Sequence, residues 1–168
     1  MELSAEQRRF LWLFQSLLPF LVNVVLNGAI GWAMFRNASE VPLWGTTSIG
    51  GDTLGTSFFL PAITCLIVTP LVRSQVKQGA APAFSGALAG WLLPFRRPLV
   101  PRAVALGAAC LPLAGGLGVA LLMGFGVESL RFGAFLGWKA LYAGVLGALV
   151  TPAIALLALA DPPAAQRA

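Results

Sequence analysis

The sequence predicts an all-α membrane protein in which four transmembrane helices form one bundle, a single transmembrane domain covering residues 1–168. Hydrophobic residues make up 58% of the chain and charged residues only 10%, whereas roughly a quarter of an ordinary soluble domain is charged. Four apolar runs each meet or exceed the roughly 20 residues that a helix needs to cross about 30 Å of hydrocarbon. The predicted helices cover residues 10–35, 52–73, 102–127 and 133–160.

The first helix, residues 10–35, follows two arginines but is too long for the core of a secretion signal, which has roughly 7 to 15 apolar residues. We therefore expect it to be retained as a transmembrane helix. Polar and small side chains recur on it every four residues and so share one face. That face must contact protein or water, because lipid tails offer no hydrogen bonds. Its members are Gln15, Pro19, Asn23, Asn27 and Gly31.

The second helix, residues 52–73, begins at Asp52, whose simplest role is an N-cap that accepts amide hydrogen bonds. Because this helix runs antiparallel to the first, several hydroxyl groups fall at the level of the two asparagines. Two interpretations follow: interhelical hydrogen bonds that join the helices, or a polar cavity that forms a solute path. The hydroxyl residues are Thr53, Thr56 and Ser57 at the level of Asn27, and Thr64 near that of Asn23.

The middle loop contains an unusually apolar segment, residues 82–95, which holds Trp91 and is followed by Arg96 and Arg97. Such a segment is expected to lie in the cytoplasmic interface, with its arginines near lipid phosphates. The alternative is a docking surface for another membrane subunit, because apolar patches rimmed by charge often mark interaction sites.

The fourth helix carries a charged residue and is followed by another, whereas the third helix carries a stripe of small residues. In the fourth, Lys139 lies about two turns from the helix start, from where it can snorkel to the outer interface. Turned inward toward Asp52 or Asn27, it would instead form an anion or proton site. Asp161 is expected to end the last helix. The third helix carries a stripe that favours close backbone approach, made of Ala108, Pro112, Gly116, Ala120 and Gly124.

Short matches relate the two halves of the chain. Leu18-Pro19 corresponds to Leu111-Pro112, and Val68-Thr69-Pro70 corresponds to Val150-Thr151-Pro152. The matches indicate an internal repeat of two tandem helical hairpins, which would share one orientation about an axis along the membrane normal. Chance similarity is the alternative, since these residues are common in membrane helices.

The net charge of +5 is concentrated in every second gap between the apolar runs. By the positive-inside rule, this distribution places both termini and the middle loop in the cytoplasm, with the chain multi-pass in the inner (plasma) membrane. It predicts contact with the lipid bilayer and not with nucleic acid. Eight of the eleven basic residues lie on that side: Arg8, Arg9, Arg73, Lys77, Arg96, Arg97, Arg102 and Arg167.

Catalytic and metal-binding residue patterns are absent from the sequence. The chain has no histidine, and Cys65 and Cys110 stand alone on different helices, so neither a metal site nor a cofactor is expected. We expect a non-catalytic accessory or scaffold subunit, which forms a homo-oligomer or binds another membrane protein. The alternative is a small channel or transporter whose polar path follows the first helix.

Overall fold

The computed structural model of the chain describes residues 9–81 and 88–161, and within them it confirms the all-α bundle. Four helices are long and apolar enough to cross a membrane, so the chain is an integral, multi-pass membrane protein. The first span joins η1 (Phe10–Leu17) to α2 (Leu18–Phe35), and the second is α3 (Ile49–Lys77). The third joins α4 (Leu99–Cys110), η3 (Leu111–Gly116) and α5 (Leu117–Gly124), and the fourth is α6 (Phe132–Leu159).

The second span begins three residues earlier than predicted, because Ser48 and not Asp52 is its N-cap. The Ser48 hydroxyl accepts a hydrogen bond from the Gly51 amide at 3.2 Å, which satisfies one of the free donors of the first turn. Asp52 therefore lies inside the first turn. The expected cap at Asp52 is wrong, and its carboxylate is left available for another contact.

Two π-helical segments interrupt the first and third spans next to the matched Leu-Pro pairs. Segment η1 ends one residue before Leu18, and η3 begins at Leu111. A proline removes an amide donor from the helical ladder and crowds the preceding turn, and wider π turns are one way to absorb this irregularity.

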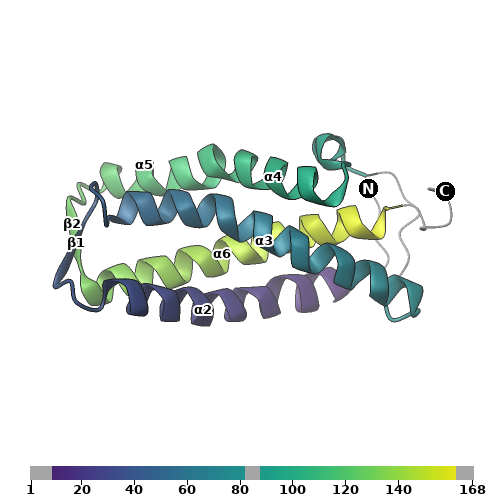
Figure 1. Cartoon of the computed structure of the whole chain (residues 1–168), viewed down its shortest axis with the longest axis horizontal. Coiled ribbons are helices and arrows are strands. Elements are labelled where there is room, and N and C mark those ends of the chain that lie inside the picture. The colour runs from purple at the N-terminus through teal and green to yellow at the C-terminus, as the bar shows by residue number, and fades with distance from the viewer. Residues whose placement is uncertain (1–8, 82–87, 162–168) are drawn as a thin grey trace.

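Helix α6 is the central element of the bundle, with α2 packed along one side and α3 along another (Figure 1). Helix α3 also packs against the third span, whereas α2 and α3 make almost no direct contact, although they are consecutive. Glycines on α6 explain this order, because Gly144 lies against Phe20 and Val24, and Gly147 lies against Asn23. The missing Cβ atoms let α2 approach α6 closely.

The small-residue stripe expected on the third span lies in the wrong register. The glycines of this span that contact α3 and α6 are Gly107, Gly115 and Gly118, whereas Gly116 and Gly124 have open space around them. The third span therefore turns the face that carries Gly107, Gly115 and Gly118 toward the core, and not the face that carries Gly116 and Gly124.

The strand end of the bundle, defined by β1 (Glu40–Pro42) and β2 (Ser129–Arg131), joins the loops that follow the first and third spans (Figure 1). The strands pair antiparallel, with Glu40 opposite Arg131. Beneath them lies a small apolar core formed by Phe35, Val41, Leu43, Ile49, Leu122 and Phe135.

At the opposite, terminal end, the described chain begins at Arg9 and ends at Asp161. There the 3-10 helix η2 (Gly90–Phe95) buries Leu92 against the ends of α3 and α6, while Trp91 stays exposed. The rest of the apolar segment expected at 82–95 lies partly outside the described residues, which omit 82–87. The internal repeat also stays a prediction.

Candidate functional site

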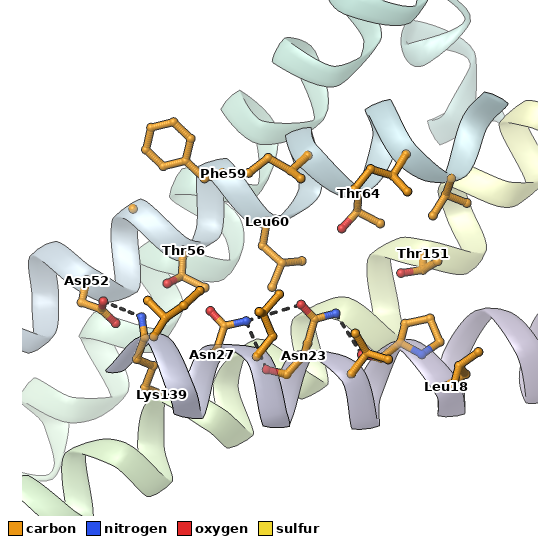
Figure 2. Close-up of a pocket in the computed structure, with 18 of the residues that line it drawn as sticks. Leu18, Asn23, Asn27, Asp52, Thr56, Phe59, Leu60, Thr64, Lys139 and Thr151 are labelled. Carbon is orange, nitrogen blue, oxygen red and sulfur yellow. Dashed lines mark hydrogen bonds and ion pairs between the residues drawn. The ribbon is translucent and has the colours of Figure 1, made fainter. Parts of the chain in front are cut away.

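A long groove separates α2 from α3, and α6 forms part of its floor (Figure 2). Its volume is about 940 Å³, in the upper part of the range of roughly 300 to 1,000 Å³ typical of ligand sites. It extends from Gln15 and Gln75 at the terminal end to Ser48 and Phe35 at the strand end. The groove therefore follows the polar stripe that the sequence indicated on the first helix.

The walls of the groove are two continuous helix faces. The residues of the α2 wall recur at intervals of three and four, as do those of the α3 wall, which is the spacing of one helix surface. Many of these apolar side chains are exposed at the rim, so the groove opens sideways along the membrane-spanning surface. The exposed rim residues include Leu18, Val22, Leu26, Ile30, Phe59, Ile63, Ile67 and Leu71.

The asparagines of the stripe bond within their own helix. The Asn23 carboxamide nitrogen donates to the Pro19 carbonyl at 2.9 Å, and that of Asn27 donates to the Asn23 carbonyl at 3.1 Å. Among the described residues, neither asparagine bonds to α3. The expected interhelical hydrogen bonds to the second helix are therefore wrong, because α2 packs on α6 and leaves the groove on its α3 side.

The four hydroxyl residues predicted on the second helix divide into two pairs. Thr56 and Thr64 line the groove (Figure 2). Thr53 and Ser57 are buried on another face of α3, where Thr53 accepts a hydrogen bond from the Trp138 indole at 3.1 Å. The Ser57 hydroxyl shares a hydrogen bond with the hydroxyl of Tyr142 at 2.6 Å. These two bonds join α3 to α6, away from the groove.

At the strand end of the groove, the Lys139 ammonium bonds to an Asp52 carboxylate oxygen at 2.5 Å (Figure 2). Their side chains are only 3% and 11% exposed. Lys139 turns inward because Gly31 leaves room for its aliphatic stem, which a Cβ at that position would strike. The interpretation in which Lys139 snorkels to the interface is thus wrong, because its side chain turns inward to Asp52. The anion or proton site stays a prediction.

A second charge cluster holds the terminal end together, and sequence reasoning missed it. Asp161 accepts hydrogen bonds from Arg73 of α3 and Arg102 of α4, both as short as 2.6 Å. Arg102 is almost fully buried. Burial alone would raise the pKa of Asp161, but the hydrogen bonds from the two arginines outweigh it and lower that pKa below its ordinary value. Asp161 therefore cross-links three spans instead of only ending the last one.

Gln75 is a second residue that the sequence did not indicate. It lines the groove, and its carboxamide oxygen is buried without a hydrogen-bond partner in the described structure. Nothing in the sequence around Gln75 distinguishes it from a solvated residue near a helix end. By contrast, the partners of Asp161 had a readable signal, because Arg73 and Arg102 stand at the same predicted membrane level as the acid.

No protein-family model, curated protein or solved structure matches the chain. Within residues 9–81 and 88–161, no three histidine, cysteine or acidic side chains lie close enough together to hold a metal ion.

Proposed function

We propose that the chain is a non-catalytic accessory subunit of the plasma membrane, and that the α2–α3 groove receives a transmembrane helix of another membrane protein. The observation that carries this proposal is the pair of continuous helix faces that border the groove and remain uncovered. Helix packing depends on ridges at intervals of three and four residues, and both walls offer such ridges across most of the span. The absence of catalysis is part of the proposal and stays a prediction.

The polar lining of the groove favours a helix over lipid tails as its occupant. Asn27, Thr56 and Thr64 face a space that lies within the membrane-spanning part of the bundle. Lipid tails cannot bond to these groups, whereas a transmembrane helix can present serine, threonine or asparagine side chains to them. The exposed leucines and isoleucines at the rim then supply apolar contact on either side.

A second candidate function is a solute path, which the Asp52–Lys139 pair favours because it places two charges beside Asn27 and Thr56 on the groove. The groove of one chain is open at the side, so a path would need another chain to enclose it. A second copy seated in the groove would support this candidate over the accessory role.

The first test fills the groove. A photoreactive amino acid at Ile63, an exposed groove residue, should form an adduct with a single membrane protein in native membranes, whereas one at Leu113 on η3 should not. Gly55→Trp places an indole in the groove at a position where a Cβ meets nothing within 4 Å. In the Gly55→Trp variant the yield of the Ile63 adduct should fall about tenfold or more, since a side chain too large for its site costs about 1 to 3 kcal/mol.

Gly137→Trp is the matched control. Gly137 is the sixth residue of α6 as Gly55 is the seventh of α3, and it also has open space around it, but it does not line the groove. The Gly137→Trp variant should leave the yield of the Ile63 adduct unchanged. Adducts with lipid only, or equal losses in both variants, would contradict the accessory role.

The orientation is a separate proposal, with both termini and the middle loop in the cytoplasm, based on the distribution of basic residues. With Cys65 and Cys110 replaced by serine, Arg97→Cys should be protected from an impermeant thiol reagent in intact cells. Glu40→Cys, in β1 at the opposite end, should react. Reversed labelling would overturn the orientation.

A further inference from the structure

Two glutamine side chains line the terminal end of the groove, and one of them has a buried oxygen without a hydrogen-bond partner in the described structure. Gln15 lies in η1, lines the groove and is only 7% exposed, and its carboxamide makes no hydrogen bond with another described residue. Gln75 lies near the end of α3 on the opposite wall, and its buried carboxamide oxygen has no partner. The two groups belong to different spans but line the same cavity.

The buried oxygen of Gln75 is an exception that requires an explanation, because most buried polar atoms in proteins are hydrogen-bonded. The asparagines farther along the groove show the usual outcome, since each bonds to a carbonyl of its own helix. Gln75 has no such local partner, and the nearby Ser74 hydroxyl already accepts a hydrogen bond from Gln78. Leaving a buried carboxamide oxygen unbonded costs free energy, so the Gln75 oxygen, with Gln15 across the groove, is placed for a donor from outside the described residues.

The surroundings narrow the chemistry of that group. The free atom of Gln75 is an oxygen, which requires a donor and repels a carboxylate. Lys77 lies two residues farther along α3 and takes part in no ion pair among the described residues, so its charge disfavours a lysine or arginine from the partner at this end of the groove. A neutral hydroxyl or carboxamide fits both conditions, because it donates to Gln75 and also pairs with either end of the Gln15 amide.

We propose that Gln15 and Gln75 fix the register of the bound helix by hydrogen bonding to neutral polar side chains, serine, threonine, asparagine or glutamine, near one end of that helix. The inference rests on the accessory role proposed above and names the chemistry that the partner must carry. Along the rest of the groove, apolar contacts hold the helix without specifying its axial position, as expected where packing alone drives association.

The test replaces each glutamine by methionine, which has a similar length but no strong hydrogen-bonding group. The Ile63 adduct should weaken about threefold to tenfold in Gln15→Met and in Gln75→Met, the range expected for interhelical hydrogen bonds. Gln75→Glu keeps the acceptor oxygen and should retain the adduct. Gln78→Met, at an exposed glutamine outside the groove, is the control and should have no effect.

The outcomes separate the two proposals. If the unmodified protein forms no protein adduct at Ile63, the accessory role itself fails. If the adduct forms and both methionine variants retain it, only the register site is overturned. Thermal unfolding in detergent shows whether a variant is folded. Equal melting temperatures, with a weaker adduct in both methionine variants and an unchanged adduct in Gln75→Glu, would support the hydrogen-bonding role.

Discussion

Replacing Lys139 by methionine is expected to lower the free energy of unfolding by about 3 to 5 kcal/mol, the range measured when one partner of a buried ion pair is removed. The substitution leaves the Asp52 carboxylate, which is 11% exposed, beside the groove without its cation. Methionine fills much of the space of the lysine stem against Gly31, so the loss reports the charge and not a cavity. Denaturant titration in detergent measures it.

The matched control is Lys77→Met, because Lys77 is exposed at the terminal end and takes part in no ion pair among the described residues. It should change stability by less than about 0.5 kcal/mol. The double variant Lys139→Met/Asp52→Leu should recover most of the lost stability, since apolar replacement of a whole buried pair is often neutral or stabilising. Equal effects of Lys139→Met and Lys77→Met would contradict the buried pair.

Asp161→Asn is expected to cause a loss of similar size, about 3 to 5 kcal/mol, since it leaves the buried Arg102 guanidinium without a counter-charge. Arg73 contributes less, because its side chain is 28% exposed and solvent screens its charge. Arg73→Leu should therefore be milder than Asp161→Asn. Melting temperatures in detergent at pH 7 would show the order of the two variants.

Asp161 also makes the stability of the folded chain depend on pH, in a direction that its pKa defines. The pKa of Asp161 is lower in the folded chain than its ordinary value of 3.8, so the stabilisation is fully present above that value. It is lost as the pH falls through the lowered pKa of the folded state. Between pH 7 and pH 5 this residue should cause no change, whereas at more acidic pH the unmodified protein should lose stability faster than Asp161→Asn. Parallel acid profiles would exclude the cluster as the cause.

The bundle itself was predictable because hydropathy and length constrain transmembrane helices strongly. The four apolar runs became the four spans, with shifts of a few residues where local signals compete. At the start of α3, both Ser48 and Asp52 are good capping residues, and composition alone does not decide between them.

The order of helix packing was not predictable from the stripe on the first helix. Asn23 and Asn27 indicated a face that needed protein or water, and they do line the groove. The sequence could not show that Gly144 and Gly147 of α6 would bring α2 to the fourth span and away from the second. Glycines favour close approach between any two helices, so their partners emerge only from the packing of the whole bundle.

The direction of Lys139 depended on a similar three-dimensional detail. A lysine two turns from a helix end can reach the interface or a buried acid with the same stem length. The choice followed from Gly31 on another helix and from Asp52 being free of a capping role. Each of these conditions lies outside the local sequence of α6.

The ion pairs at the terminal end have a mechanical consequence for the groove. They connect α3, α4 and the residue after α6, and none includes a residue of α2. At the strand end, the loop that follows α2 is held by the pairing of β1 with β2. Helix α2 and η1 are therefore held by close packing on α6 and by the strand pairing, and by no ion pair among the described residues. The two walls of the groove thus depend on different forces: acid should weaken the ionic contacts of the α3 wall at the terminal end, whereas the packing of the α2 wall on α6 should be unaffected.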